Sequence, residues 1–152
     1  MTTPFLQKLT YALQATTTRA LLAFFSCLSA ERASALGGWI GRTIGPRLAK
    51  TRIAGANLKA ALPGRHKDDY EAIIKNMWDN LGRSFAEYPH LPTILSRHTE
   101  IKGHDTLEKI KASDKGAVFF SAHLANWEIP GTLLAFKGLD IVLLHREPNN
   151  PY

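Results

Sequence analysis

The chain is poor in cysteine, and its N-terminal third is poor in acidic residues. Cys27 is the one cysteine among 152 residues, so an internal disulfide is excluded and the thiol fits a reducing compartment. Between residues 2 and 53, Glu31 is the one acid, against the basic residues Lys8, Arg19, Arg32, Arg42, Arg47, Lys50 and Arg52. The formal net charge of +6 favours an anionic partner: a phospholipid surface, a phosphorylated substrate, an acidic carrier protein or nucleic acid.

A long hydrophobic run is also missing from the N-terminal region. The apolar run from Ala20 to Ala30 has about half of the ~20 residues that span a bilayer, and Arg19 and polar residues precede it. Lys8 and Arg19 bracket polar sequence, which is unlike a compact secretory signal. We therefore predict that residues 1–30 form a helix that lies on an anionic bilayer rather than spanning it. The alternative is an ordinary helix with a solvated basic face.

The next part of the chain has the pattern of helices. We expect a helix over 4–30 and a second helical stretch over 31–61, which Pro46 and its neighbouring glycines interrupt. A third helix begins near Asp68, because carboxylates favour a helix N-terminus, and its apolar positions follow the helical period. Pro89 ends that pattern, so we assign residues 31–98 to a helical region.

The pattern changes after residue 98. Short segments over 99–103, 117–122 and 141–145, of which the last two are apolar, predict strands, separated by predicted helices over 105–113 and 127–136. Strands that alternate with helices at this spacing indicate a parallel or mixed sheet covered by helices. The predicted fold class is therefore α/β: a helical N-terminal region followed, over 99–152, by the start of an α/β catalytic domain.

The candidate site lies where the second predicted strand ends. His123 follows the strand, and Glu128 falls in the first turn of the next helix, so the two side chains can meet across the turn. A carboxylate that holds a histidine in one tautomer makes that histidine a general base. Asn126 offers an amide that fixes the turn, Trp127 offers a ring that excludes water, and backbone N–H groups at the helix start are suited to an oxyanion. The alternative is a structural histidine that caps the strand.

Two other features compete with this assignment. The same spacing recurs at His66 and Glu71, but within a polar run at the start of an amphipathic helix, which predicts a solvated helix start. Ser121 would face the same way as His123 on a strand and would act as a nucleophile, giving an acyl-enzyme. The Gly-x-Ser-x-Gly turn that exposes such a serine is absent from the sequence.

These motifs resemble those of the bacterial lipid A biosynthesis acyltransferases, the lauroyl and myristoyl type within the lysophospholipid acyltransferase superfamily. The resemblance covers essentially the whole chain. It is carried by the segment His123–Glu128, which is similar to the family's His-x4-Asp/Glu box in its Asn-Trp-Glu form. Further similar segments are Asn57-Leu58 with Leu62-Pro63, Asn80-Leu81-Gly82-Arg83 with Glu87, and the segment from His145 to Pro151.

The resemblance implies an enzyme on the cytoplasmic face of the bacterial inner membrane, with a glycerolipid-acyltransferase-like α/β sandwich. It would transfer a fatty acyl chain from acyl carrier protein to a hydroxyl of a lipid A precursor or related anionic glycolipid. His123 and Glu128 would be catalytic, Arg146 and Asn126 would bind substrate, and no metal or cofactor is expected. Family members are about twice as long, so the resemblance also implies an N-terminal half that is inactive alone.

Three alternatives remain at this point. The acceptor could be another glycolipid or a lysophospholipid, because the box recognises only a hydroxyl and a thioester. The chain could also be an inactive, membrane-bound helical fragment. A nucleic-acid binder is disfavoured, because the basic residues accompany aliphatic stretches rather than exposed aromatic platforms or a known binding motif.

Overall fold

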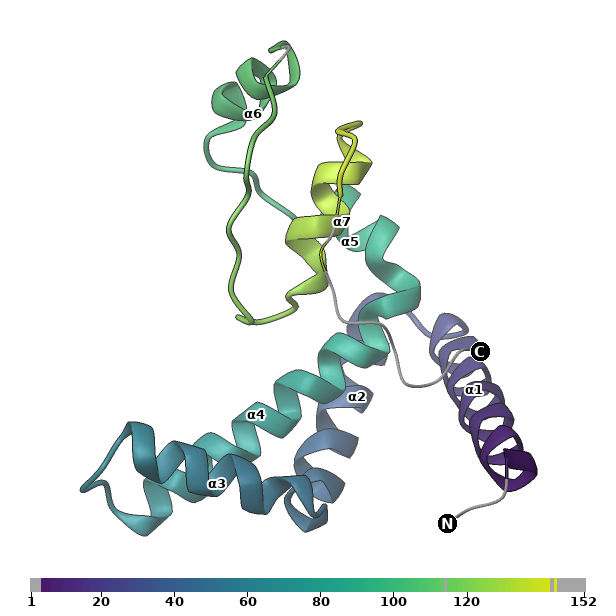
Figure 1. Cartoon of the computed structure of the whole chain (residues 1–152), viewed down its shortest axis with the longest axis vertical. Helices are drawn as coiled ribbons and strands as arrows, with labels where there is room; N and C mark the ends of the chain where they lie inside the picture. The colour runs from purple at the N-terminus through teal and green to yellow at the C-terminus, as the bar shows by residue number, and fades with distance from the viewer. Residues whose placement is uncertain (1–3, 114, 143, 145–152) are drawn as a thin grey trace.

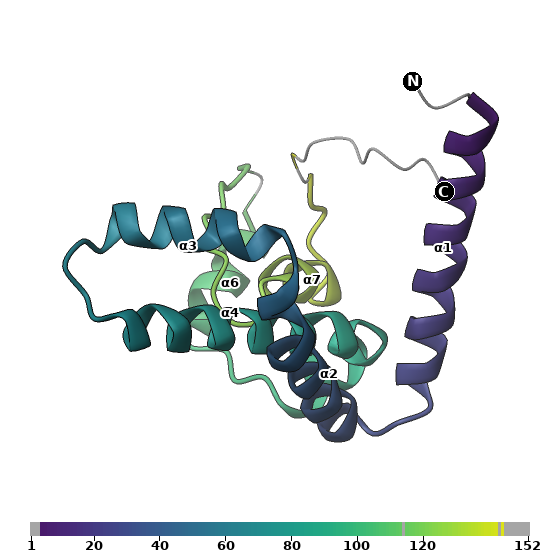
Figure 2. The same ribbon diagram turned by 90° about the horizontal axis from the view of Figure 1, so that it is seen from below.

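The computed structural model describes residues 4–113, 115–142 and 144. Within these residues the chain forms α1 (Pro4–Ser26), α2 (Ala30–Ile44), the 3₁₀ helix η1 (Gly45–Arg47), α3 (Lys50–Ala61), α4 (Lys67–Glu87), the 3₁₀ helix η2 (Tyr88–His90), α5 (Leu91–Arg97), α6 (His104–Lys111) and α7 (Glu128–Phe136). Helices α2 and α4 cross at the centre of the helical region, and α3 folds back along α4 (Figures 1 and 2).

Helices α2 and α4 pack with their backbones in contact, because glycines line the crossing. A Cβ at Gly82 would lie 2.1 Å from the carbonyl oxygen of Gly37, and a Cβ at Gly41 would lie 2.1 Å from that of Trp78. The indole of Trp78 covers Gly45 in the same way. Glycines four residues apart lie on one face of a helix, so their spacing creates this close contact. We call the contact the glycine seam.

The small hydrophobic core lies where the end of α1 meets the glycine seam. Phe25, Ala33 and Ala86 are buried there, with Leu28, Leu36 and Ile40 packed against them. Phe25 makes an edge-to-face contact with Phe85, with ring centroids 6.4 Å apart, and its carbonyl oxygen lies 3.0 Å from Nε2 of His90. Helix α1 is thus anchored through its C-terminal end.

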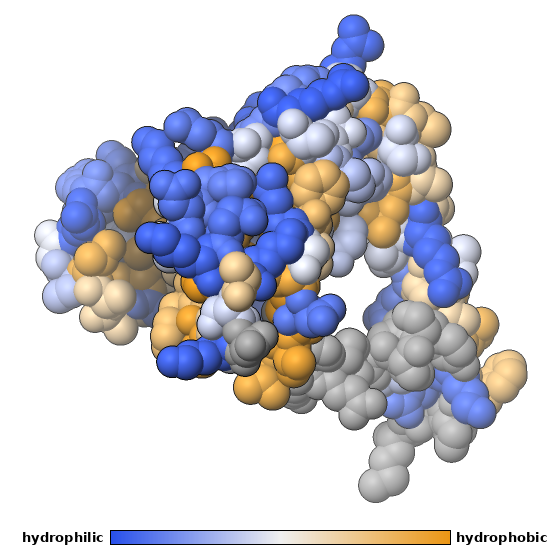
Figure 3. Space-filling model, turned by 90° about the horizontal axis from the view of Figure 1, so that it is seen from above, coloured by the Kyte–Doolittle hydropathy of each residue, from blue (hydrophilic) through white to orange (hydrophobic). Residues whose placement is uncertain are grey.

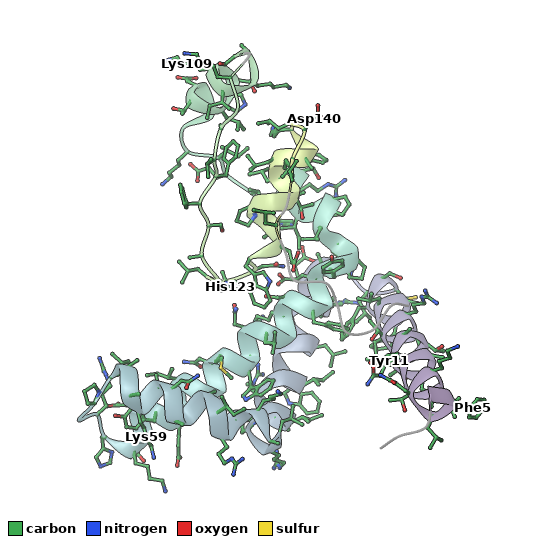
Figure 4. The ribbon with its side chains drawn as sticks, viewed as in Figure 1. Phe5, Tyr11, Lys59, Lys109, His123 and Asp140 are labelled. Carbon is green, nitrogen blue, oxygen red and sulfur yellow. The ribbon has the colours of Figure 1, made fainter. Side chains whose placement is uncertain are left out.

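The rest of α1 projects away from the other helices (Figure 1). Phe5, 73% exposed, points outward at its N-terminal end (Figure 4). Among the described helices, none combines the length and the apolar character needed to cross a bilayer.

The predicted helices are confirmed, with boundaries shifted by a few residues. The interruption expected near Pro46 is the 3₁₀ helix η1 between α2 and α3, and α4 begins at Lys67. The predicted end of the third helix near Pro89 is also confirmed. Helix α4 ends at Glu87, and a proline lies in the first turn of both η2 and α5, where proline is tolerated. Helices α6 and α7 correspond to the predicted segments 105–113 and 127–136.

The predicted α/β sandwich is wrong for the described part of the chain, which forms helices and loops and contains no strand. Residues 99–103 form a loop and turn, and residues 117–122 run alone between α6 and α7 (Figure 1). A strand needs a neighbouring strand for its backbone hydrogen bonds. No such bond joins the predicted strands within the described residues, and Phe120 is 93% exposed. The third predicted strand, 141–145, lies partly outside those residues.

Candidate functional site

His123 lies in the loop before α7, beside α4 (Figure 4). Its imidazole packs against the indole of Trp127 in a tilted arrangement, with ring centroids 5.6 Å apart. The His123 side chain is exposed, and Glu128 at the start of α7 is half-buried. Both residues are described, and the structure shows no hydrogen bond or ion pair between their side chains. The two residues lie on the same turn, as the sequence predicts, but their side chains do not bond each other in this structure.

The turn between His123 and α7 has an unusual backbone. Ala125 has a φ of 47°, in the left-handed region that a non-glycine residue adopts at a cost of about 1 kcal/mol or more. Its carbonyl oxygen accepts a hydrogen bond from Asn80 Nδ2 at 2.8 Å. The hydroxyl of Ser84 shares its one proton between this oxygen, at 3.4 Å, and the carbonyl oxygen of Asn80, at 3.0 Å. Both donors lie on α4, so α4 stabilises the strained turn.

Asn126 makes the second connection between the turn and α4. Its Nδ2 donates to Oε2 of Glu87 at 2.7 Å, and its Oδ1 accepts from the backbone N–H of Glu128 at 3.2 Å. Asn126 is 9% exposed, and both ends of its amide are hydrogen-bonded. The N–H of Ile129 donates to the carbonyl oxygen of Asn126 at 3.2 Å. Two of the N–H groups expected to face an oxyanion are therefore bonded within the turn.

A pocket of about 420 Å³ lies between this turn, α2, α4 and α5. Polar and charged side chains from several elements line it: Glu31, Ser34, Asn80, Arg83, Ser84, Glu87, His98 and Asn126. The pocket joins the turn to a charged network on α4, because Arg83 donates to Ser34 Oγ at 3.2 Å and to Asp79 at 2.5 Å. The site thus has a hollow, lined by polar and apolar side chains, on the side of the turn that faces α4.

Two carboxylates near this pocket titrate below their ordinary range. Hydrogen bonds from Arg83, together with Arg42 at 2.5 Å, lower the pKa of Asp79. The backbone N–H of Glu31 and the hydroxyl of Ser29 lower the pKa of Glu31. Both groups are therefore charged near neutral pH.

A second hollow, of about 400 Å³, is apolar and shares no residue with the first. Helix α4 contributes to both from different faces: Leu81 and Phe85 line the apolar groove, and Asn80 and Ser84 line the polar pocket. The groove also contains residues of α1 and α2, such as Leu21 and Ile40.

The remaining candidates lie elsewhere. His66 is the N-cap residue of α4 and its imidazole is exposed, which confirms the predicted solvated helix start. Ser121 is exposed in the loop between α6 and α7. Arg146 lies outside the described residues. Within the described ranges, no cluster of His, Cys, Asp or Glu side chains is suited to a metal ion.

Sequence reasoning assigned no role to Asn80, Ser84 and Glu87. These residues are spaced four and three apart on an amphipathic helix, so they form a polar stripe on one face. That stripe was the available signal, but only the fold brings the turn of Asn126 against it.

Comparison with known proteins identifies the family. The family model for bacterial lipid A biosynthesis acyltransferases matches residues 3–152, almost the whole chain. The chain belongs to this acyltransferase family. It is also similar to lipid A biosynthesis acyltransferase 2 of Shigella flexneri, with 28% identity over 120 residues. The match covers 76% of the chain and 37% of that relative. No solved structure matches the chain.

Family membership confirms the resemblance drawn from the motifs. The chain spans a little over a third of the length of its curated relative, as the 37% coverage shows.

Proposed function

We propose that the protein transfers a fatty acyl chain from acyl carrier protein to a hydroxyl of a lipid A precursor, with His123 as general base and Glu128 as its orienting acid. The observation that carries the proposal is the His123–Glu128 box on a turn held to α4, in a chain of the lipid A acyltransferase family. The pocket beside the turn has hydroxyl and amide side chains that can form hydrogen bonds with the hydroxyls of a sugar.

In the proposed reaction, Nε2 or Nδ1 of His123 removes the proton of the acceptor hydroxyl. The oxygen attacks the thioester carbonyl, and the tetrahedral intermediate collapses with departure of the carrier thiol, which takes a proton from the imidazolium. Glu128 stabilises that imidazolium by its charge. Because the acceptor attacks directly, Ser121 is not required and no acyl-enzyme forms. The side chains of His123 and Glu128 must approach each other on substrate binding, as catalytic hydrogen bonds often tighten in the Michaelis complex.

Substrate contacts and location are further parts of the proposal. Arg146 would pair with a phosphate or carboxylate of the acceptor, for which a planar guanidinium is well suited. Asn126 was also predicted to bind substrate, and in the structure its amide contacts Glu87 and Glu128. The protein would act at the cytoplasmic face of the bacterial inner membrane, with its basic N-terminal region on anionic lipid.

The second candidate is acyl transfer to another glycolipid or to a lysophospholipid by the same box. A third hypothesis is that residues 1–152 alone are an inactive membrane-bound fragment. The exposed apolar side chains of α1 and of the 117–122 loop favour this hypothesis. Mass spectrometry of the lipid formed by the full-length protein separates the acceptors.

The experiment that tests the catalytic pair uses single variants of the full-length protein. We expect His123→Ala and Glu128→Ala each to lower acyl transfer by about 100-fold or more, the usual scale for a general base, with the thermal transition preserved. His66→Ala is the matched control, since that residue has the same spacing to a glutamate on an exposed helix start, and it should retain activity. Greater damage from His66→Ala than from His123→Ala would overturn the assignment.

A further inference from the structure

The turn that carries the catalytic pair is fixed to α4 by side chains outside the box. Three α4 residues donate to or accept from it: Asn80 and Ser84 bond the carbonyl oxygen of Ala125, and Glu87 bonds the amide of Asn126. These partners are about forty residues apart in sequence, so the contact belongs to the fold and not to the local turn.

We propose that Glu87 is a positioning residue which, through Asn126, sets the start of α7 and hence the direction of the Glu128 carboxylate toward His123. The inference rests on the proposed function. The path is continuous: Glu87 Oε2 accepts from Asn126 Nδ2 at 2.7 Å, and Asn126 Oδ1 accepts from the backbone N–H of Glu128 at 3.2 Å. We call this path the Glu87 relay.

Asparagine is the residue that this path requires. The connection needs a donor toward Glu87 and an acceptor toward Glu128 on one short side chain, and an amide supplies both. Aspartate has the same length but is acceptor-only when ionised, so it would place a second carboxylate against Glu87. A bond between a carboxylate and an N–H donor is also stronger than one between neutral groups. The relay therefore depends on an acceptor oxygen of Glu87 that faces the amide donor of Asn126.

The base of the relay is rigid. Helix α4 packs along the glycine seam, where the backbone of Gly82 contacts that of Gly37. The turn is strained at Ala125, which has a φ of 47° and is held by two α4 donors. Strain next to a proposed reaction centre, kept in place by a rigid helix, is the arrangement expected of a preorganised site. Small displacements matter there, since a shift of about 1 Å can cost about 100-fold in rate.

The test exchanges the hydrogen-bond donor and acceptor between Asn126 and Glu87 in the full-length enzyme. Asn126→Asp turns the 2.7 Å contact into two facing acceptors and should lower kcat by about 10-fold to 100-fold, with KM for the acyl donor unchanged. The double variant Glu87→Gln/Asn126→Asp restores a donor and an acceptor in reversed order, while an aspartate oxygen still accepts from the N–H of Glu128. We expect it to recover most of the lost kcat. Glu87→Gln alone should have a small effect, because its amide oxygen still accepts from Asn126.

Glu71→Gln is the matched control, an acid-to-amide change on the exposed face of α4, and it should leave kcat unaltered. A double variant no more active than Asn126→Asp, or losses of kcat that follow the loss of thermal stability, would overturn the inference. If Asn126→Asp does not fold, Glu87→Ala and Glu87→Gln test the same inference. We then expect a large loss of kcat in Glu87→Ala, which removes the acceptor, and a small loss in Glu87→Gln, which keeps it. An active His123→Ala variant would refute the proposed function itself, whereas an inactive His123→Ala with a fully active Asn126→Asp would refute only the relay.

Discussion

Asp79 lies between two guanidinium groups, and its charge links the stability of the α2–α4 pair to pH. Its carboxylate bonds Arg42 and Arg83, each at 2.5 Å, and is 21% exposed. The two arginines are exposed by more than a third, so solvent screening limits each ion pair to about 1 kcal/mol or less. Asp79 thus makes a modest contribution to the free energy of unfolding. Because this contribution depends on the charge of the carboxylate, its dependence on pH distinguishes it from packing.

We predict that Asp79→Asn lowers the free energy of unfolding of the full-length protein by about 1 kcal/mol at pH 7. The folded state lowers the pKa of Asp79 below its ordinary value of 3.8, so its stabilisation is complete above that value and is lost as pH falls through the lower folded pKa. In urea denaturation, the difference in the free energy of unfolding between wild type and variant should therefore shrink below pH 3.8. An equal difference at acidic and neutral pH would mean that packing, not charge, causes the loss.

At the scale of single residues, the sequence predicts His123 and Glu128 as the candidate pair, and its prediction that His66 belongs to an exposed helix start is confirmed. It included Glu87 in a segment similar to the family but gave this residue no role, because nothing in a local pattern shows which face of α4 the later turn contacts. Asn126 was noticed from its place between the pair, but its partner became evident only in three dimensions.

At the scale of elements, the glycine seam sets how closely α2 and α4 pack. We predict that Gly82→Ala destabilises the protein by about 1–3 kcal/mol, the usual cost of overpacking, because its Cβ would lie 2.1 Å from the carbonyl oxygen of Gly37. Gly55→Ala is the control, since the nearest atom to its Cβ is 3.5 Å away, and it should stabilise α3 by up to about 1 kcal/mol. Thermal and urea unfolding measure the change in stability of both variants. Equal effects of the two substitutions would contradict the role of the seam.

Helix α1 is the element expected to contact membrane. Phe5, Leu9 and Leu13 lie four residues apart on its exposed side, beyond the part that packs against α4 and η2. Each buried methylene contributes about 0.8 kcal/mol, and salt does not screen this term. High salt should therefore release only part of the protein from anionic vesicles in a flotation assay.

Replacing Phe5, Leu9 and Leu13 together by serine should make the remaining binding fully sensitive to salt. The control substitutes serine at Ala12 and Ala20 of the same helix, which removes little apolar surface and should leave flotation nearly unchanged. Complete release of the wild-type protein by salt alone would show a purely electrostatic contact and refute the apolar anchor.

At the scale of the whole molecule, apolar side chains lie at the surface among hydrophilic ones (Figure 3). Val118, Phe120, Leu124 and Val142 are all strongly exposed in the described loops after α6. In a strand these side chains would pack against covering helices, but here neither neighbouring strands nor helices cover them. The described part of the fold after α6 is therefore poorly packed.

We predict that residues 1–152 expressed alone aggregate or bind detergent, while α1 to α5 keep their helical structure because their contacts are largely local. Light scattering with and without detergent, circular dichroism and an acyl-transfer assay test this, and we expect helical signal without turnover. A monodisperse, detergent-free monomer with acyltransferase activity would refute it. The full-length protein, assayed in parallel, is the control.

The sequence alone determined the helices and the box, because each depends on residues close together in the chain, and motifs spread along the chain indicated the family. Helix hydrogen bonds join residues four apart, and proline, glycine and capping residues fix the helix ends locally. Strand pairing and the contacts that hold the turn of the candidate site depend on distant partners. The bond between Asn80 and Ala125 joins residues 45 apart, and that between Glu87 and Asn126 joins residues 39 apart. Only the tertiary structure decided that α4 holds this turn, and that the apolar segment before His123 is unpaired.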